Sequence, residues 1–286
     1  MARAAGALTI GPAKRREFGW PFAAGDSIFR PMPASSPDCA IRVDRLAKRF
    51  GKVTAVDELT FDVRAGDIVG LLGGNGAGKT TTISMLLGLL TPSAGALEVL
   101  GVDMLRRRYE VLPRLNFSSP YVDLPKRLTA RENLTVYANL YGVADVKGRL
   151  AQVAGDLGIG AILDRPYGEL SSGQKTRISL AKSLLNEPEL LLLDEPTASL
   201  DPDTADLVRG YLKDFQVRRG ATLLLASHNM AEVERLCDQV LMMKQGRIVD
   251  RGSPKELLSR YGRQNLEDVF LDIARNRPRA EATAAQ

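Results

Sequence analysis

The sequence predicts an α/β fold: a parallel sheet that carries a phosphate-binding loop, together with an antiparallel β subdomain and a helical subdomain. Three observations predict it. A glycine-rich loop at 73–80 stands between a short apolar run and a helical pattern. Two further apolar runs, at 190–193 and 221–226, have the length of buried strands and end in polar residues. Over 41–63, apolar and polar residues alternate as they do in half-buried strands.

The antiparallel subdomain is expected to begin near residue 39. Residues 41–46 and 53–63 alternate as strands do, 50–52 have the composition of a turn, and 96–100 add another strand. Ahead of them, residues 1–38 hold five of the fifteen prolines and no apolar run of the length that a secretory signal needs. We interpret residues 1–38 as a disordered extension, with a basic arm for a membrane surface as the alternative.

Residues 73–80 read Gly-Gly-Asn-Gly-Ala-Gly-Lys-Thr and fit G-x-x-x-x-G-K-[ST], the pattern of a phosphate-binding loop. Its glycines let the backbone curl so that N–H groups point at phosphate oxygens, and the following helix adds partial positive charge. In this pattern Lys79 neutralises the β- and γ-phosphates, and Thr80 holds Mg²⁺ through its hydroxyl. The predicted nucleotide-binding residues are Gly73, Gly74, Asn75, Gly76, Ala77, Gly78, Lys79, Thr80 and Thr81.

Residues 102–168 contain no β-rich run and are expected to be mostly helical. Thr129 and Glu132 form a capping box for a helix that ends near Gly142, and 146–157 have the spacing of a second helix. We expect a helical subdomain between the two halves of the sheet. The alternative is that these helices simply cover the sheet.

A further helix is predicted to start after Leu170, where Ser171 and Gln174 have the spacing of a capping box. One interpretation is a well-capped helix and nothing more. The other is that the N-terminus of this helix faces a γ-phosphate. These residues by themselves favour neither interpretation.

Two acidic residues and the single histidine follow the later apolar runs. The leucines at 190–193 suit a strand buried on both faces, which places Asp194 and Glu195 at the edge of the sheet where α/β proteins bind ligands. We predict that Asp194 binds Mg²⁺, directly or through water, and that Glu195 is the base that deprotonates the attacking water. His228, at the end of 221–226, is predicted to donate a hydrogen bond to the γ-phosphate.

The order of these motifs resembles that of the ATP-binding subunits of ABC transporters, over about residues 41–262. The resemblance rests on the phosphate loop, followed by Leu-Ser-Ser-Gly-Gln at 170–174, Leu-Leu-Leu-Leu-Asp-Glu-Pro at 190–196, Ser-Leu-Asp at 199–201 and Ser-His at 227–228. It implies a P-loop NTPase with a RecA-like parallel sheet. A β-hairpin at 240–249 and a last capped helix from 253 complete the predicted elements.

The resemblance also assigns roles to single residues. Phe50 is assigned to stacking on adenine, Asp201 to a loop that crosses a dimer interface, and His228 to sensing the γ-phosphate. The residues that would grip the γ-phosphate bound to the other subunit are Ser171, Ser172, Gly173 and Gln174.

The chain departs from the family pattern at three positions. Gly74 stands where proline is usual. Residues 170–174 correspond to the family's signature sequence Leu-Ser-Gly-Gly-Gln, and Ser172 replaces its first glycine. No glutamine occurs between 96 and 151, where the family has one that reaches Mg²⁺ and the attacking water. Counting back from the capping box of the first helix places the equivalent at Ser119 or Pro120. We take Ser119 as the candidate metal contact, because a serine hydroxyl can accept from a metal-bound water.

By this resemblance, residues 39–262 form an ATP-binding domain, with its helical subdomain at about 102–168 and a C-terminal tail at 263–286. The chain is expected to bind and hydrolyse ATP with Mg²⁺ and to power a transporter through separate membrane-spanning subunits at the cytoplasmic face of the membrane. Two copies, or this chain and a related one, would pack head to tail. Residues 265–271 of the tail resemble the C-terminal segment of ATPase subunits from multidrug and polysaccharide exporters. This resemblance favours export.

Composition bears on the alternatives. The chain is 44% apolar and 26% charged, as soluble globular proteins are, and no apolar run reaches the eighteen residues of a membrane helix, so membrane partners are expected to be separate chains. The net charge of +5 comes mostly from the two terminal segments, which argues against a nucleic-acid-binding face. A soluble ABC ATPase that remodels a nucleic-acid or ribosomal complex is for this reason only the second hypothesis. A slow ATPase with a regulatory role is the third hypothesis. Cys39 and Cys237 have no metal-binding spacing.

Overall fold

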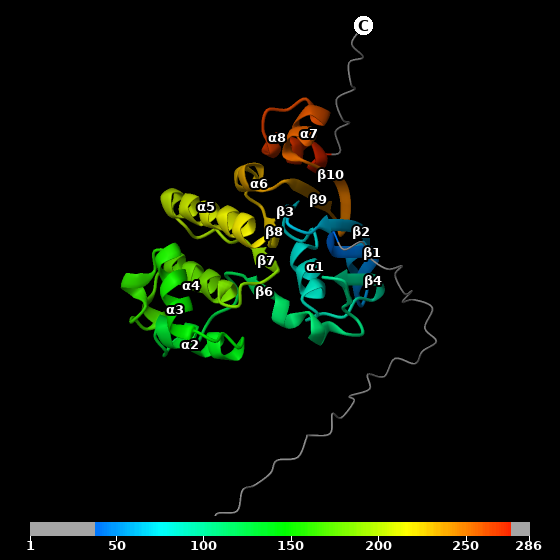
Figure 1. The fold of residues 1–286 in the computed structure, drawn as a ribbon. Helices are drawn as coiled ribbons and strands as arrows, with labels where there is room; N and C mark the ends of the chain where they lie inside the picture. Colours follow the sequence, from blue (N-terminus) through cyan, green and yellow to red (C-terminus); the bar gives the residue numbers. More distant parts are fainter. Residues whose placement is uncertain (1–37, 276–286) are drawn as a thin grey trace, which may run out of the picture.

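The computed structural model describes residues 38–275, and the proposed N-terminal extension up to residue 37 lies outside the described residues. Figure 1 shows a sheet-based lobe and a smaller lobe of helices beside it. The strands are β1 (Cys39–Phe50), β2 (Val53–Arg64), β3 (Ile68–Gly73), β4 (Ala94–Val99), β5 (Val102–Asp103), β6 (Leu115–Ser118), β7 (Leu190–Asp194), β8 (Thr222–Ser227), β9 (Gln239–Lys244) and β10 (Arg247–Gly252). The α-helices are α1 (Lys79–Leu86), α2 (Ala130–Leu140), α3 (Val146–Asp156), α4 (Ser172–Leu184), α5 (Pro202–Arg219), α6 (Met230–Leu236), α7 (Pro254–Tyr261) and α8 (Leu266–Ala274). Single turns of 3₁₀ helix lie at Arg108–Glu110, Leu112–Arg114, Gly160–Ile162 and Tyr167–Glu169.

The strands form two sheets, which confirms the predicted α/β class with an antiparallel part. The first has the order β2-β1-β4-β5 and is antiparallel. The second has the order β10-β9-β3-β8-β7-β6, and all its neighbours are parallel except the hairpin of β9 and β10. Figure 1 shows α1 between β7 of the second sheet and β1, β2 and β4 of the first. The phosphate loop leads from β3 at the centre of the second sheet directly into α1.

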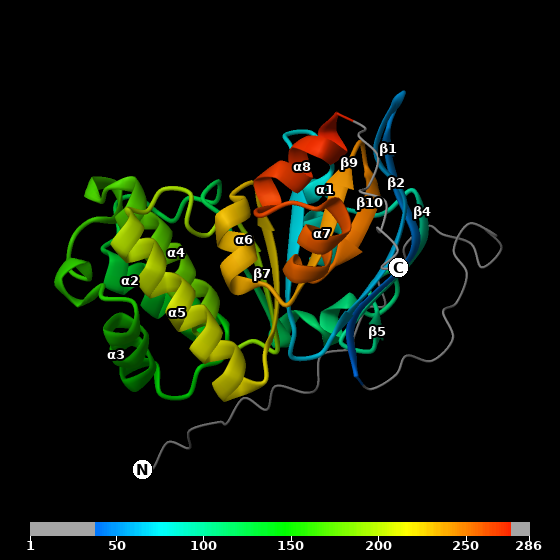
Figure 2. The same cartoon turned by 90° about the horizontal axis from the view of Figure 1, so that it is seen from above.

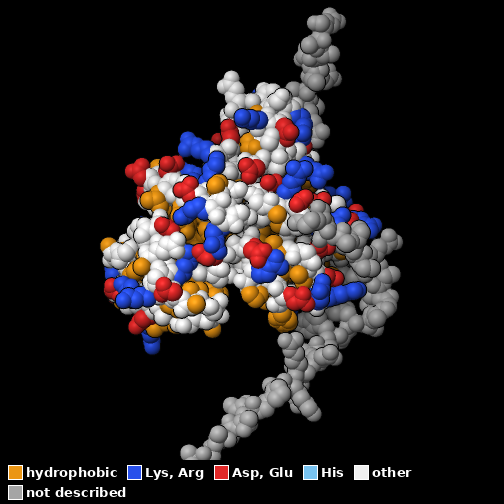
Figure 3. All heavy atoms as spheres, viewed as in Figure 1, with side chains coloured by type: hydrophobic (Ala, Val, Ile, Leu, Met, Phe, Trp, Pro, Cys, Tyr) orange, Lys and Arg blue, Asp and Glu red, His pale blue; other side chains and the backbone are white. Residues whose placement is uncertain are grey.

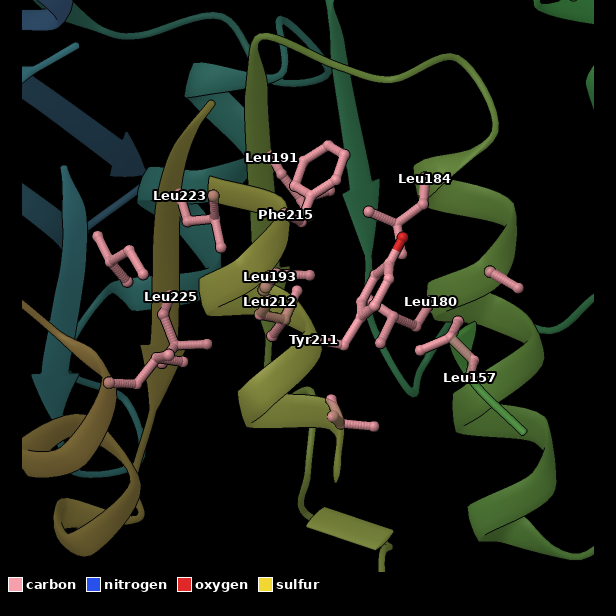
Figure 4. Packing of buried hydrophobic residues seen from close by; sticks show 14 of the residues in the cluster. Leu157, Leu180, Leu184, Leu191, Leu193, Tyr211, Leu212, Phe215, Leu223 and Leu225 are labelled. Carbon is pink, nitrogen blue, oxygen red and sulfur yellow. The ribbon is translucent and has the colours of Figure 1, made fainter. Parts of the chain in front are cut away.

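The leucines of β7 divide between two hydrophobic cores, as the sequence predicted for a strand buried on both faces. Leu191 and Leu193 pack in the core that the parallel sheet shares with α2–α8, whereas Leu190 and Leu192 pack in the core around α1 and the antiparallel sheet. All four side chains are fully buried. Figure 4 shows α5 in the first core, where Tyr211 and Phe215 lie between the strand leucines and the leucines of α4. Because these strands are close-packed on both faces, the positions of their carboxyl ends are fixed. The candidate site described below lies at these ends.

The helical subdomain begins later than the sequence indicated. Residues 102–168 were expected to lack strands, but β5 joins the antiparallel sheet and β6 pairs in parallel with β7. These strands have two and four residues, too short for alternation to be read. The helical lobe therefore consists of α2, α3 and α4. Its α2 is held by the predicted capping box, in which Thr129 and Glu132 each bond the backbone N–H of the other.

Residue 262, where the predicted ATP-binding domain ends, is followed by one more helix of the same hydrophobic core. Helix α8 lies within the predicted tail, yet Leu266 and Val269 are fully buried in the core of the parallel sheet. Lys244 caps α8 by donating to the carbonyl oxygens of Ile273 and Ala274, both at 2.9 Å. Among the described residues, no helix is long and apolar enough to cross a membrane.

Candidate functional site

The phosphate loop has the backbone that its glycines predict. Gly76 and Gly78 have φ angles of +76° and +101°, in the region that favours glycine. A Cβ at Gly78 would lie 2.6 Å from the Ala55 carbonyl oxygen, so this position also needs the missing side chain. The turn between β9 and β10 supports the loop, because Gly246 donates to the Ala77 carbonyl at 3.0 Å. Exposed Asn75 and Gly76 form the open side of the loop.

Lys79, the first residue of α1, folds back onto the loop. Its Nζ donates to the carbonyl oxygens of Gly73 at 2.6 Å and Gly74 at 3.3 Å. The side chain is 8% exposed, and this burial lowers the pKa of Lys79, while the nearby carboxylates of Glu195 and Asp194 act in the opposite direction. The ammonium therefore lies in the loop, close to the two acids, where phosphate oxygens would bind.

Asp194 is the last residue of β7, and it is almost completely buried. Burial, then the neighbouring Glu195, raise its pKa, while Lys79 and a hydrogen bond with Thr80 lower it. In the described part of the chain, Asp194 Oδ2 is one of four buried side-chain polar atoms without a hydrogen-bond partner. A buried carboxylate oxygen without a donor is costly. A hard cation with oxygen ligands, held between Asp194 and Thr80, would satisfy this oxygen, so the residues present fit Mg²⁺.

Glu195 and His228 form a pair. The Nδ1 of His228 lies 2.6 Å from Glu195 Oε1, and because an ionised carboxylate only accepts, Nδ1 donates. Glu195 is 9% exposed, whereas the His228 side chain is 63% exposed, so the pair extends from the sheet to the surface. Glu195 has a φ of +51°, rare for a residue with a side chain, and its N–H donates to the Ala226 carbonyl at 2.8 Å.

The register of the parallel sheet places these residues at one edge. Asp194 pairs with Ala226, one residue before the end of β8, and Ser227 pairs with Leu72, one residue before the end of β3. Lys79 belongs to α1, which begins after the loop that leaves β3. Lys79, Thr80, Asp194, Glu195 and His228, separated by up to 149 positions in sequence, thus meet at the carboxyl ends of three adjacent strands.

Sequence reasoning missed one member of this cluster, Glu232 of α6. Its two oxygens accept from Thr197 Oγ1 at 2.6 Å and from Ser227 Oγ at 3.0 Å. The residue is 2% exposed, and burial raises its pKa. The signal in the sequence is its place four residues after His228, about one helical turn beyond the end of a predicted core strand.

The signature residues are at the N-terminus of α4, away from this cluster. The capping box is present: Ser171 Oγ accepts from the N–H of Gln174, whose Oε1 accepts from the N–H of Ser171. A Cβ at Gly173 would lie 2.9 Å from the Ser199 carbonyl oxygen, so α4 approaches the loop after β7 closely. Asp201 caps α5 by accepting from the N–H of Thr204 at 3.0 Å. In both Figure 1 and Figure 2, α4 and α1 lie on different sides of β7.

Two predicted contacts lie at the margins of the site. Phe50, at the end of β1, is 49% exposed, and the ammonium of Lys48 stands 5.1 Å from its ring centroid. Ser119, which follows β6, is 4% exposed, and its Oγ accepts from the N–H of Tyr121 at 3.3 Å. Because Ser118 pairs with Leu193, Ser119 leaves the sheet level with Asp194.

Comparison with known proteins identifies the family of this chain. The profile of the ABC transporter family matches residues 56–198. The chain is 38% identical over 226 residues to the Nod factor export ATP-binding protein I of Paraburkholderia xenovorans (strain LB400), covering 78% of this chain and 74% of that protein. It is 37% identical over 232 residues to the bacitracin transport ATP-binding protein BcrA of Bacillus licheniformis, covering 81% and 75%.

Solved structures show the same likeness. The ATP-binding subunit of an ABC transporter is similar with a TM-score of 0.76 and 26% identity, over 82% of this chain and 99% of the other. A dimeric ATP-binding cassette in a post-hydrolysis state, bound to ADP and Pi, has a TM-score of 0.70 over 74% of this chain and 98% of the other. The second structure is 19% identical and is alike in fold.

Proposed function

This chain belongs to the ABC transporter family as an ATP-binding, ATP-hydrolysing subunit, and we propose that it powers an exporter whose membrane-spanning parts are separate chains. The relatives named above act in the export of Nod factor and in bacitracin transport. The observation that carries the catalytic part is the Glu195–His228 pair, 2.6 Å apart, at the sheet edge that also holds Asp194 and the phosphate loop.

Each residue of this cluster has a distinct task in hydrolysis. Lys79 exchanges its carbonyl partners in the loop for the β- and γ-phosphate oxygens. Glu195 accepts the proton of the attacking water, and His228 fixes the orientation of that carboxylate by donating from Nδ1. When both ring nitrogens carry a hydrogen, Nε2 of His228 donates to the γ-phosphate. Thr80 and Asp194 would hold Mg²⁺, which, when bound, neutralises charge on the β- and γ-phosphates.

The complete site needs a second subunit. Ser171, Ser172, Gly173 and Gln174 belong to the helical lobe, whereas the phosphate loop lies on the other side of β7. A head-to-tail dimer, of this chain with itself or with a related one, would bring the N-terminus of α4 to the γ-phosphate in the partner's loop. Asp201, exposed at the start of α5, would lie at that interface.

The membrane-spanning subunits would dock where Figure 3 shows a notch, between α2 and the segment after β4, with hydrophobic side chains on both of its sides. Apolar side chains are unusually exposed in these segments, Tyr109 at 74% and Leu140 at 72%, and Tyr121, in the loop between β6 and α2, is 80% exposed. A subunit docked there would place this chain at the cytoplasmic face of the membrane.

The catalytic proposal is tested with Glu195→Gln. Loss of a positioned base typically lowers the rate by about 10²–10⁴-fold, so turnover should nearly vanish while ATP binding persists. Glu58→Gln is the matched control, because Glu58 is exposed and also has a φ of +51°. Lys79→Ala should instead weaken ATP binding. Native turnover in Glu195→Gln, or unchanged affinity in Lys79→Ala, would show that these roles are wrongly assigned.

The partner proposal is tested by the retention of the chain on membranes that contain its transporter. Leu140→Asp should release the chain, whereas Val217→Asp on α5, equally apolar and 70% exposed, should not. Co-purification with RNA in place of membranes would favour the nucleic-acid alternative. An ATPase rate that no membrane partner raises would favour the regulatory one.

A further inference from the structure

The carboxylate of Glu232 occupies a position that hydrolysis as described above does not explain. It is 2% exposed and, four residues after His228, lies behind the reacting groups. Burial of a carboxylate is costly unless its oxygens are hydrogen-bonded. Here each oxygen has a hydroxyl donor, Thr197 Oγ1 at 2.6 Å on Oε1 and Ser227 Oγ at 3.0 Å on Oε2. The N–H of Glu232 is held as well, by Asn229 Oδ1 at 3.1 Å.

The two donors belong to different functional segments. Ser227 ends β8 and directly precedes His228. Thr197 lies two residues after Glu195, in the loop that continues to Asp201. One carboxylate on α6 therefore connects the segment of the histidine with the segment that leads from the base to the expected dimer interface.

Ser227 also limits where Glu195 can lie. Its hydroxyl has a single hydrogen and two carboxylate acceptors, Glu232 Oε2 at 3.0 Å and Glu195 Oε2 at 3.4 Å. The shorter distance assigns the hydrogen to Glu232. This leaves His228 as the donor that orients Glu195. Without Glu232, the Ser227 hydroxyl would turn to Glu195 Oε2 and draw away the carboxylate that His228 holds at Oε1.

We infer that Glu232 is a positioning residue for hydrolysis: it holds Ser227 and Thr197 so that Glu195 stays directed by His228 toward the attacking water. The inference rests on the proposed role of Glu195 as base. Glu232 is buried behind the hydroxyl groups of Thr197 and Ser227, so it would act on the attacking water only through them. Its loss should therefore lower kcat and leave the KM for ATP nearly unchanged.

The first test measures kcat, KM and nucleotide affinity for Glu232→Ala and Glu232→Gln. A displacement of about 1 Å of a reacting group can cost about 10²-fold in rate, so kcat of Glu232→Ala should fall by about tenfold to a hundredfold. Glu232→Gln keeps an acceptor for Thr197 but presents an N–H to Ser227, so its loss should be intermediate. Glu234→Ala, two residues further along α6, is the matched control: its carboxylate accepts from the N–H of Leu266 and should leave kcat unchanged.

A second pair of variants decides the matter if Glu232→Ala fails to fold. Thr197→Val removes only the hydroxyl that donates to Glu232, at nearly constant volume, and Thr197→Ser restores it. We expect Thr197→Val to lower kcat at unchanged ATP affinity and Thr197→Ser to recover most of it. A native kcat in Thr197→Val, or in a folded Glu232→Ala, overturns the inference. If Glu195→Gln itself keeps its turnover, the proposed base is wrong and the inference falls with it.

Discussion

The hydrogen bond between Ser118 and Ser179 offers a sharp test of how the helical lobe is attached to the sheet. Ser118 ends β6 and Ser179 lies in α4, and their Oγ atoms are 3.1 Å apart with both residues at most 5% exposed. Replacing either with alanine leaves the other hydroxyl buried without this partner, which costs about 1–3 kcal/mol. Replacing both removes donor and acceptor together, so the double variant should cost less than the sum of the single ones.

The expected coupling is about 1 kcal/mol, measured from the free energies of unfolding of the two single variants and the double variant. For a domain of this size, each 1 kcal/mol corresponds to a shift of about 2–4 °C in Tm. Ser183→Ala is the control in the same helix, because Ser183 Oγ bonds within α4 to Leu180 at 2.8 Å and should combine additively with Ser118→Ala. Additivity of Ser118→Ala with Ser179→Ala, within about 0.3–0.5 kcal/mol, would refute the proposed link.

Three further predictions concern single side chains. Ser119→Ala should lower the ATPase rate and raise the Mg²⁺ concentration for half-maximal rate at unchanged ATP affinity; a Mg²⁺ titration with no shift would remove Ser119 from the metal site. Asp194→Asn should raise the Tm of the nucleotide-free protein, because a carboxylate whose pKa burial raises is a cost to folding above that pKa; chelation of Mg²⁺ should then no longer lower the Tm measured with ATP. Burial lowers the pKa of Lys182 from 10.5 to about 8, so between these pH values the unfolded chain binds more protons than the native protein does. The native protein should therefore gain stability relative to Lys182→Met as the pH rises through that window. A difference in Tm between the two proteins that stays constant with pH would contradict this prediction.

The sequence predicted those parts of the fold that local periodicity determines. The alternation in β1 and β2, the leucines of β7 and the capping boxes at Thr129 and Ser171 depend on neighbours within a few residues, and all are present. The short strands β5 and β6 were missed because their pairing partners are distant in sequence and their length gives no period. The packing of α8 was missed for the same reason, since its burial depends on α6 and α7.

The sequence predicted which residues form the candidate site, but it did not predict the contacts between them. Spacing alone identified Lys79, Asp194, Glu195 and His228, and the structure brings them to one edge of the sheet, while the roles assigned to them stay predictions. No local pattern indicates that Nδ1 of His228 binds a residue 33 positions earlier. Glu232 illustrates the limit best. An acid in a helix is usually exposed, and only the fold shows that this one is enclosed by hydroxyl groups from two other segments.

The way the two lobes are joined separates the chemistry of hydrolysis from its coupling. Lys79, Asp194 and Glu195 all depend on central strands that are buried on both faces, so a small rotation of the helical lobe would leave them in place. The same rotation would carry the N-terminus of α4, because α4 belongs to that lobe. Helix α4 is also bonded to the edge strand β6, through Ser179 and through Lys182, whose Nζ donates to the Phe117 carbonyl at 3.1 Å. Strand β6 leads directly to Ser119 at the level of Asp194, where we propose that Mg²⁺ binds, so we expect a change there to reach α4 through this strand. Breaking the Ser118–Ser179 bond should thus weaken the dependence of hydrolysis on the partner subunit more than the basal rate of a single site.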